Sequence, residues 1–327
     1  MKPIVSITNI LPDAGLDALR PHCELHLNES DNPPGRDDLA RMAKISQGMI
    51  TYLSDKIDGN IIDGGQNLKV IANYAAGFNN IDFAHAEQKG IWVTSTPNVL
   101  DETTADLTWA MILGVARRIV PADRFTREGH FKGWAAKLFL GYDVHGKTLG
   151  VIGCGEIGSA VARRAIGFGI KVLYYQRHRL SEKKELEINA TYVPLDQLLK
   201  ESDFITLHLP LNENSHYMIK KGQFAMMKKT AFLINAARGQ VVKDRDLLNA
   251  VRNGTIAGAA LDVYEHEPDI IEGLLDEDRV LVLPHIGSAS YETRDRMAVL
   301  VAENVLDVLV RDQDPRTPVN CPANGYK

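Results

Sequence analysis

A short apolar segment that runs into a glycine-rich turn and then a helix constrains this chain most strongly. Residues Leu149–Ile152 are apolar and predict a buried parallel strand. Gly153, Gly155 and Gly158 follow at the spacing G-x-G-x-x-G, and apolar residues recur at helical intervals from Ile157 onward. The first glycine allows a tight turn, the second lets backbone approach a pyrophosphate, and the third lets the helix pack on the strand. Because a helix start also offers free N–H groups to phosphates, the segment predicts a dinucleotide-binding loop.

Length and composition set the broad class. The chain has 327 residues, which is longer than one ordinary domain, so we expect two. With 45% hydrophobic and 24% charged residues it resembles other globular proteins that build sizeable cores. The formal charge is −5 and no dense basic block is present, so we expect no nucleic-acid partner.

Cysteine usage and apolar segments bear on the compartment. Cys23, Cys154 and Cys321 are odd in number and lack C-x-x-C spacing, which favours a reducing compartment and no metal site. The N-terminus has no long apolar run after its lysine, and no segment approaches the length of a membrane span. The prediction is a cytoplasmic protein with no membrane partner.

Strands alternate with helical segments in both halves of the chain, which favours parallel sheets covered on both faces. The first half predicts four strands, at Ile4–Thr8, Gly48–Thr51, Val70–Asn73 and Trp92–Thr94. The second half predicts six, at Leu149–Ile152, Lys171–Tyr175, Phe204–Leu207, Ala231–Asn235, Gly258–Asp262 and Val280–Leu283. That number suits a doubly wound nucleotide-binding sheet of the Rossmann type.

Helices between and after the strands divide the chain. A long helix is expected at Asp101–Arg118, then a loop-rich connection at 122–142, and a last amphipathic helix at Ser288–Val310 that returns to the first sheet. We therefore expect a smaller, flavodoxin-like substrate domain from residues 1–100 and 288–327. Residues 101–287 would form the dinucleotide-binding domain, with hinges near 98–101 and 285–288 and a cleft between the domains.

The segment after the second nucleotide strand bears on the choice of cofactor. Gln176 stands where NAD-preferring sites usually hold a carboxylate for the ribose 2′-hydroxyl, and no carboxylate is present here. Arg177 and Arg179 follow, and guanidinium groups match a 2′-phosphate in charge and geometry. The segment favours NADP over NAD, although NAD remains possible. The alternative is an exposed basic turn.

Three charged side chains follow strands of the same predicted sheet. Arg238 comes directly after one strand, the segment Asp262–Glu267 carries three carboxylates, and His285 follows the last strand. A glutamate beside the histidine would favour imidazolium, which can donate a proton. With hydride from a reduced nicotinamide, an arginine clamp and an acid could reduce a 2-keto acid. Taken singly, the arginine could be a surface ion-pair residue, the acidic run a solvated turn, and the histidine structural.

A glycine turn in the first half offers a second anion site. Ala75, Ala76 and Gly77 follow a predicted strand and could present bare N–H groups to a small carboxylate. A simple turn explains the same residues equally well.

At this point the chain resembles the D-isomer-specific 2-hydroxyacid dehydrogenases, and within them the glyoxylate/hydroxypyruvate reductases. The resemblance covers nearly the whole chain and rests on these motifs: Asn73–Asp82, Thr103–Asp106, Gly153–Gly158, Leu209–Leu211, Asn235–Gly239, Leu261–Pro268 and Pro284–Ser288. It implies NADPH-dependent reduction of glyoxylate or hydroxypyruvate to the D-2-hydroxy acid.

The resemblance also implies roles. Arg238 would clamp the substrate, Glu267 would be the partner carboxylate, with Glu265 structural, and His285 would be the general acid. Backbone at Ala76 and Gly77 would bind the substrate carboxylate, with Leu53 lining the pocket. Asp262 would hold the nicotinamide carboxamide. The full set expected at the cofactor is Thr104, Gly153, Gly155, Glu156, Ile157, Gly158, Gln176, Arg177, His208, Pro210, Ala236, Asp262 and Gly287.

Three other readings stay open. Phosphite dehydrogenases resemble this chain but carry a lysine where it has Ala76, which makes phosphite a poor substrate candidate. 2-Ketogluconate reduction is a further alternative. Corepressors similar to these dehydrogenases sense nicotinamide without turnover, but they usually add docking surfaces and tails.

The oligomeric state is indicated by aromatic residues. The predicted helix 101–118 and the loop after it carry Trp109, Phe125, Phe131, Trp134 and Phe139. Such a patch often meets a partner, although it could also pack on its own core. The resemblance implies a homodimer through this region.

Overall fold

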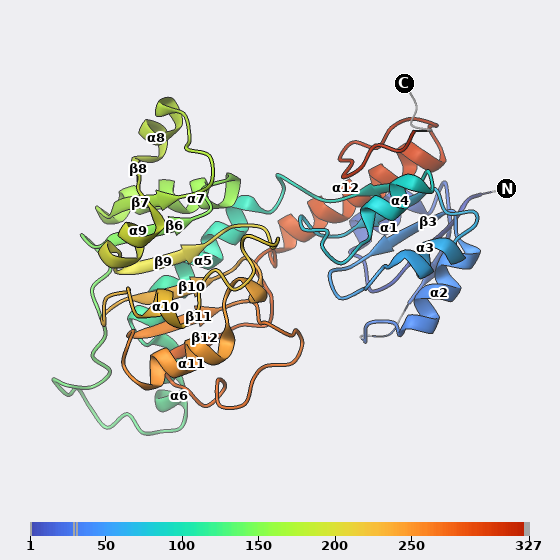
Figure 1. The fold of residues 1–327 in the computed structure, drawn as a ribbon. Helices are drawn as coiled ribbons and strands as arrows, with labels where there is room; N and C mark the ends of the chain where they lie inside the picture. Colours follow the sequence, from blue (N-terminus) through green and yellow to red (C-terminus); the bar gives the residue numbers. More distant parts are fainter. Residues whose placement is uncertain (1, 29, 31, 324–327) are drawn as a thin grey trace. The chain divides into compact units, whose positions relative to one another are not determined.

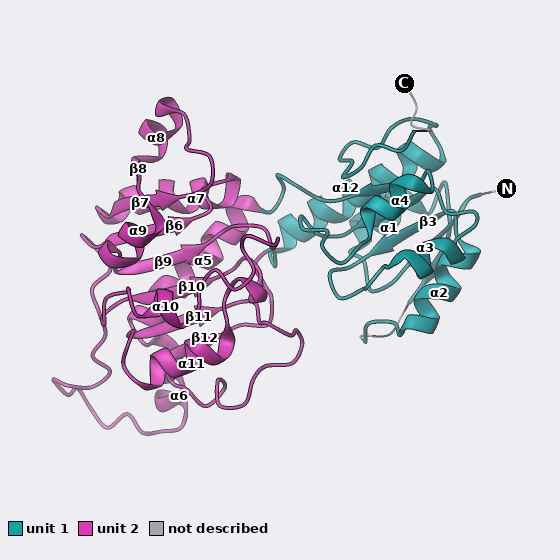
Figure 2. Ribbon diagram, viewed as in Figure 1, with its two compact units in different colours: residues 1–100, 288–327 teal, residues 101–287 magenta. Residues whose placement is uncertain are grey.

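The computed structural model describes residues 2–28, 30 and 32–323. The chain forms two compact units, one from residues 1–100 with 288–327 and one from residues 101–287 (Figure 2). The second unit is therefore an insertion within the first.

Unit 1 contains a five-stranded sheet in the order β2-β1-β3-β4-β5, with every pairing parallel (Figure 1). Its strands are β1 (Ile4–Ile7), β2 (Glu24–Leu27), β3 (Gly48–Thr51), β4 (Val70–Asn73) and β5 (Trp92–Thr94). Its helices are α1 (Asp13–Leu19), α2 (Arg36–Ile45), α3 (Gly59–Gly64), α4 (Phe83–Gln88) and α12 (Tyr291–Leu309). The strand order is the flavodoxin-like one expected.

Helices cover the two faces of this sheet. Apolar residues of α2, α3 and α4 pack with Met49, Ile71 and Val93 into one core. On the other side α12 packs against α1, β3 and β4. The contact is close, because a Cβ at Gly15 of α1 would lie 2.8 Å from the carbonyl oxygen of Ala298 on α12. The last helix begins at Tyr291 and ends at Leu309, a shorter span than Ser288–Val310, since the Ser290 side chain caps it at Thr293 N–H.

Unit 2 contains a seven-stranded parallel sheet in the order β12-β11-β10-β9-β6-β7-β8. Its strands are β6 (Thr148–Ile152), β7 (Lys171–Tyr175), β8 (Ala190–Tyr192), β9 (Phe204–Leu207), β10 (Phe232–Asn235), β11 (Gly258–Leu261) and β12 (Val280–Val282). Its helices are α5 (Asp101–Ala116), α6 (Ile119–Arg127), α7 (Glu156–Ala165), α8 (Glu182–Ile188), α9 (Leu195–Glu201), α10 (Lys221–Phe224) and α11 (Asp244–Arg252), with short 3₁₀ turns η1 (Ile166–Phe168) and η2 (Gly239–Val241).

Alternating side chains of the central strands divide unit 2 into two cores. On β10, Leu233 packs in the core that contains the apolar faces of α9, α10 and α11. Its neighbours Phe232 and Ile234 pack in the core that contains those of α5 and α7. Both faces of the sheet are thus covered, as a parallel sheet requires.

The strand predictions missed one strand in each sheet. The four strands expected in unit 1 are five, because β2 is an edge strand whose residues are largely exposed and carry no apolar run. The six expected in unit 2 are seven, because β8 is a three-residue edge strand.

The connection after α5 also differs from the prediction. The long helix ends at Ala116 and not at Arg118, because Arg118 has left-handed backbone with φ of 54°. Residues 119–127, partly assigned to a loop, form helix α6. Trp109 does not belong to an exposed patch: it is buried and its ring stacks on Phe168 with centroids 4.6 Å apart.

Among the residues described, no helix is long and apolar enough to cross a membrane.

Candidate active site

The order of strands in unit 2 reverses between β6 and β9, and ligands of open parallel sheets bind where this reversal lies. The glycine loop follows β6 and His208 follows β9. Gly153 has φ of 87°, and a Cβ there would lie 2.6 Å from the His208 carbonyl oxygen. A Cβ at Gly158 would lie 2.1 Å from the Gly153 carbonyl oxygen. Both positions therefore require glycine, for the turn and for the close helix.

Gly155 differs from its two neighbours because a Cβ there would meet nothing within 4 Å. Helix α7 begins at the next residue, and Ser159 N–H makes its first turn by donating to the Gly155 carbonyl oxygen at 2.8 Å. The N–H groups of Glu156, Ile157 and Gly158 precede that bond, so they have no acceptor within the helix. Open space before a helix N-terminus fits a pyrophosphate.

The second feature where the strand order reverses is the imidazole ring of His208, the first residue after β9. Both of its ring nitrogens are buried, and neither has a partner among the residues described. Burial lowers the pKa of this imidazole to about 3, so it is neutral and retains one donor and one acceptor. An unpartnered polar group beside the glycine loop fits a site for a polar cofactor.

The loop after β7 is tied to the glycine loop. Gln176 accepts a hydrogen bond from Cys154 N–H at 3.0 Å and donates to the His178 carbonyl oxygen at 2.7 Å. Arg177 is exposed, and its Nε lies 3.1 Å from His178 Nε2. The Gln176 amide thus holds the loop that carries Arg177.

Arg179 already has a partner and is therefore not available for a 2′-phosphate, the role that the sequence suggested. Its guanidinium donates to both carboxylate oxygens of Glu185 at 2.8 Å. Tyr174 hydroxyl also donates to Glu185, at 2.5 Å, and accepts from Leu180 N–H at 2.9 Å. Because Glu185 already binds Arg179, Arg177 is the arginine of this loop that has no carboxylate partner among the residues described.

His285 and Glu267 form a hydrogen-bonded pair beyond β11 and β12. The His285 Nδ1 lies 2.8 Å from the Glu267 carboxylate oxygen, and both side chains are about one third exposed. Glu267 also accepts from Tyr264 N–H at 3.0 Å, which fixes its orientation. With Nδ1 engaged, the Nε2 of His285 is the nitrogen left for a substrate.

Arg238 interacts electrostatically with Glu267. Burial lowers the pKa of Arg238, and the nearby charge of Glu267 opposes that shift. Burial would raise the pKa of Glu267, but the hydrogen bond and charge of His285, Tyr264 N–H and Arg238 together lower it. Glu267 is therefore a carboxylate held between the His285 ring and the Arg238 guanidinium, and the three residues expected to act together do lie in one cluster.

Asp262 shapes the loop that carries His285. Its carboxylate accepts from Ile286 N–H at 2.7 Å and also from Gly287 N–H. A Cβ at Gly287 would lie 3.5 Å from Thr104 Cγ2, so Thr104 of α5 borders the same loop. Of the remaining expected cofactor residues, Ala236 is half-buried after β10, and Pro210 is exposed with its carbonyl accepting from Ser215.

A buried acidic pair supports this cluster and was not predicted from the sequence. Asp244 accepts from Glu265 N–H at 3.0 Å, and Glu265 accepts from Asp244 N–H at 3.2 Å and from the Tyr217 hydroxyl. A Cβ at Gly239 would lie 1.7 Å from the Tyr264 carbonyl oxygen, so the two segments touch directly. Both carboxylate oxygens of Glu265 are therefore engaged within the fold. The partner Asp244 gave no sequence signal, because an aspartate near a helix start usually caps it.

The expected substrate residues of unit 1 lie on two loops, after β3 and after β4. Ala75 cannot offer its N–H, since it donates to the Asn73 carbonyl oxygen at 2.8 Å. The N–H groups of Ala76 and Gly77 have no acceptor among the residues described, and both residues are half-buried. Of the three backbone donors expected there, two remain.

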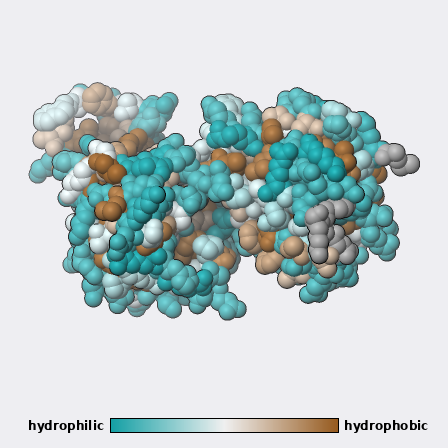
Figure 3. Space-filling model, turned by 90° about the horizontal axis from the view of Figure 1, so that it is seen from above, coloured by the Kyte–Doolittle hydropathy of each residue, from teal (hydrophilic) through white to brown (hydrophobic). Residues whose placement is uncertain are grey.

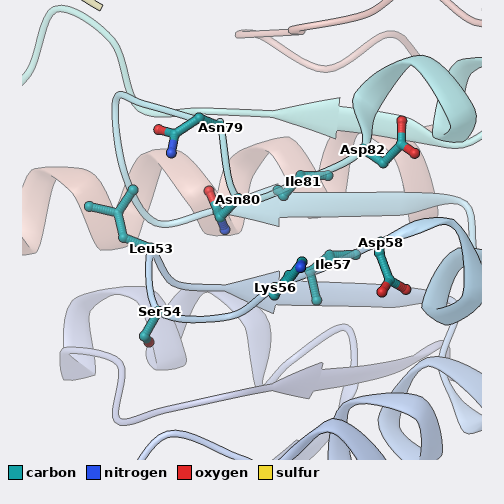
Figure 4. A pocket seen from close by; sticks show the side chains of 9 residues that line it. All are labelled: Leu53, Ser54, Lys56, Ile57, Asp58, Asn79, Asn80, Ile81 and Asp82. Carbon is teal, nitrogen blue, oxygen red and sulfur yellow. The ribbon is translucent and has the colours of Figure 1, made fainter. Parts of the chain in front are cut away.

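A pocket of about 420 Å³ opens between these two loops (Figure 4). Leu53 and Asn79 lie at one end of it, and Asp58 and Asp82 at the other, with Asn80 between them. The full lining is Leu53, Ser54, Lys56, Ile57, Asp58, Asn79, Asn80, Ile81 and Asp82. Leu53 thus lines this pocket, whereas Ala75, Ala76 and Gly77 are not part of its lining.

The side chains of this cluster can carry out acid–base chemistry at the edge of the sheet that carries the glycine loop. An imidazole bonded to a carboxylate can hold a proton at its other nitrogen, and a half-buried guanidinium such as that of Arg238 can bind an anion. In the part of the chain that the structure describes, no cluster of three or more histidine, cysteine or acidic side chains is arranged to hold a metal ion.

Comparison with known proteins gives three consistent findings. Residues 109–287 match the family model of the D-isomer specific 2-hydroxyacid dehydrogenase NAD binding domain. A glyoxylate reductase of Korarchaeum cryptofilum is 45% identical over 322 residues, which cover 98% of this chain and 96% of that protein. The crystal structure of a Thermus thermophilus protein is 39% identical with a TM-score of 0.89, and the match covers 97% of this chain and 99% of that one.

A second solved structure carries ligands. It is an NADPH-dependent glyoxylate/hydroxypyruvate reductase of Sinorhizobium meliloti in complex with NADP and malonate. It is 29% identical with a TM-score of 0.86, and the match covers 98% of this chain and 97% of that one. By its sequence, its fold and its relatives, this chain belongs to the D-isomer-specific 2-hydroxyacid dehydrogenase family and is an NAD(P)-dependent oxidoreductase.

Proposed function

We propose that this protein reduces glyoxylate or hydroxypyruvate with NADPH to the D-2-hydroxy acid. The observation that carries the proposal is the His285–Glu267 pair at 2.8 Å, with the half-buried Arg238 beside it at the edge of the sheet that also carries the glycine loop. The name of the Korarchaeum cryptofilum relative, a glyoxylate reductase, supports the substrate.

Each residue of the cluster has one task in this reaction. Arg238 binds the substrate carboxylate and the adjacent carbonyl oxygen, because its guanidinium offers paired donors. His285 gives the proton on Nε2 to the carbonyl oxygen as that oxygen gains charge. Glu267 holds the imidazole ring by Nδ1 and stabilises its cationic form. When bound, the nicotinamide supplies the hydride.

The same structure supports an assignment of residues to the cofactor. The first N–H groups of α7 would hold the pyrophosphate, and His208 would use its unpartnered ring nitrogens. Arg177 would pair with the 2′-phosphate, which supports NADPH over NADH. Asp262, Thr104 and Gly287 would border the nicotinamide end.

The test is an absorbance assay of NADPH oxidation with glyoxylate, hydroxypyruvate, pyruvate and 2-ketogluconate. Changing His285→Ala should lower kcat by about 100-fold to 10,000-fold, because the general acid is removed, while NADPH binding changes little. The matched control is His145→Ala, since His145 is exposed elsewhere on unit 2. Turnover by His285→Ala at the rate of the control would refute the mechanism.

We also propose a homodimer formed through unit 2. Large apolar side chains of residues 119–142 are exposed, and we call them the 119–142 patch: Ile119, Val120, Phe131, Trp134, Leu138, Leu140 and Tyr142. The face seen in Figure 3 is mostly hydrophilic, with scattered apolar residues. Trp134 is 87% exposed, which is unusual for a tryptophan on a surface that stays in water.

A cytoplasmic location is part of the same proposal. Cys23, Cys154 and Cys321 are all free thiols, which supports a reducing compartment. Burial raises the pKa of both Cys23 and Cys154 to about 11, so these two thiols are unreactive.

A further inference from the structure

The side chain of Asn80 joins the two loops of unit 1 that border the pocket. Its amide nitrogen donates to the Tyr52 carbonyl oxygen at 2.9 Å and to the Asp55 carbonyl oxygen at 3.0 Å, both on the loop after β3. Asn80 itself lies on the loop after β4. One amide group therefore spans from one loop to the other.

Asn73 extends this connection toward the glycine turn. Its amide nitrogen donates to the Gly77 carbonyl oxygen at 2.7 Å and to the Asn80 side-chain oxygen at 3.2 Å. Its own oxygen accepts from the Thr51 hydroxyl at 3.0 Å. Asn73 and Thr51 are fully buried, so these bonds are shielded from competing water.

Other hydrogen bonds also hold each loop in place, so Asn80 does not fix the whole of either loop. Asp55 accepts from Tyr52 N–H at 2.7 Å and from the Thr8 hydroxyl, which closes the turn after β3. Ile57 N–H donates to the Asn80 carbonyl oxygen at 2.9 Å, which joins the far ends of the loops through backbone. Near Leu53 and Gly77, the hydrogen bonds described between the two loops come from the Asn80 side chain.

The joined loops carry the residues that the proposed function uses for substrate. Leu53 lies within the segment from Tyr52 to Asp55, and Gly77 is bonded through its carbonyl to Asn73. Leu53 and Asn80 line the same pocket (Figure 4). The strand order of this sheet reverses between β1 and β3, so the loop after β3 also lies where parallel sheets bind ligands.

We propose that Asn80 is a positioning residue: its amide sets the distance between the loop after β3 and the glycine turn, and so the fit of the 2-keto acid. The inference rests on the proposed function, since it assigns these loops to substrate. Misplacing a binding group by about 1 Å can cost 100-fold in rate, so a bond between two binding loops has a measurable effect.

The test compares Asn80→Asp with Asn67→Asp in the full-length protein. Asn80→Asp keeps the shape but replaces the donating amide by a carboxylate oxygen that faces two carbonyl oxygens, so the loops separate. The KM for glyoxylate should rise about 10-fold or more, with the KM for NADPH unchanged within about 2-fold. Asn67→Asp makes the same change at an exposed position of unit 1 outside the pocket lining and should leave both values unchanged.

A second readout needs no substrate and so separates this inference from the proposed function. Amide hydrogen exchange at residues 52–55 and 76–79 should become faster in Asn80→Asp and not in Asn67→Asp. If the wild type reduces no 2-keto acid, the proposed function fails, and exchange still decides the role of Asn80. Equal exchange and equal glyoxylate KM in the two variants would overturn the inference.

If Asn80→Asp does not fold, Thr51→Val is the variant to use in the same KM measurements. Valine keeps the buried volume and removes only the hydroxyl that donates to Asn73. A raised glyoxylate KM with unchanged NADPH KM supports the proposal, and an unchanged glyoxylate KM contradicts it.

Discussion

Arg177 and Arg179 lie two positions apart on one loop, yet their guanidinium groups have different surroundings. Glu185 binds Arg179 through two hydrogen bonds of 2.8 Å, and Arg179 also lies 6.0 Å from the centre of the Tyr192 ring. Arg177 contacts only the His178 ring in the bonds described. A 2′-phosphate would have to displace Glu185 to reach Arg179, whereas Arg177 can turn to it without breaking an ion pair.

This difference predicts an asymmetry between two alanine variants. Arg177→Ala should raise the KM for NADPH about 10-fold or more and leave the KM for NADH unchanged, because a charged hydrogen bond is lost only with NADPH. Arg179→Ala is the matched control and should change the ratio of the two KM values by less than about 3-fold. Steady-state kinetics with both cofactors measure this, and an equal loss in both variants would contradict the assignment.

The sequence could not predict which residues these side chains bind. The order of strands and motifs indicated that Gln176 and Arg177 follow β7, and the glycine spacing located the turn at 153–158. Nothing in the order of residues shows that Arg179 pairs with Glu185 or that Asn80 reaches Tyr52. Those bonds depend on where a helix or a second loop is packed, which is a tertiary property.

At the scale of elements, the start of α11 and the segment after β11 are joined by two acidic side chains. Asp244 and Glu265 each accept the other's backbone N–H, and Glu265 lies two residues before Glu267. Burial raises the pKa of Asp244 from 3.8 to about 6, against the hydrogen bond from Glu265 N–H, which lowers it. The carboxyl therefore takes up a proton more readily in the folded protein than in the unfolded chain.

The raised pKa of Asp244 fixes the direction in which the free energy of unfolding changes with pH. The contribution of Asp244 to stability is fully present below about pH 4 and is lost as pH rises through about 6. Asp244→Asn keeps an acceptor for Glu265 N–H without the charge, so it should raise the free energy of unfolding at neutral pH by up to about 3 kcal/mol. Below about pH 4 the variant and the wild type should be equal.

Urea unfolding across this pH range measures the effect. Asp246→Asn is the matched control, since Asp246 is the other acidic residue in the first turn of α11. The control should show no gain at neutral pH, because the loss of charge near a helix start is unfavourable. A destabilised Asp244→Asn at neutral pH would contradict the prediction.

Elements were predictable where apolar runs are long and less so elsewhere. The buried central strands β4, β6, β9 and β10 fall where the sequence indicated. The edge strands β2 and β8 did not appear, because their residues pack little and so need no apolar pattern. The break at Arg118 could not be foreseen either, since a left-handed arginine between two helices has no marking glycine or proline.

At the scale of the whole molecule, the 119–142 patch should determine the oligomeric state. Trp134→Ser should weaken the dimer about 30-fold or more, because exposed tryptophans often dominate the binding energy of an interface. The control is Tyr291→Ser, since Tyr291 is 91% exposed on unit 1 and lies outside the patch. Light scattering coupled to gel filtration, over a range of protein concentrations, measures dissociation. A wild-type monomer at all concentrations would contradict the proposed dimer.

The insertion of unit 2 within unit 1 has a consequence for biosynthesis. During translation the strands of unit 1 leave the ribosome first, but α12, which covers β3 and β4, is made only after residue 287. The part of the first sheet's face over β3 and β4 therefore stays uncovered while the whole of unit 2 is synthesised and folds. Over that interval the nascent chain depends on chaperones or on speed to avoid aggregation, and the last helix completes the half of the molecule that was begun first.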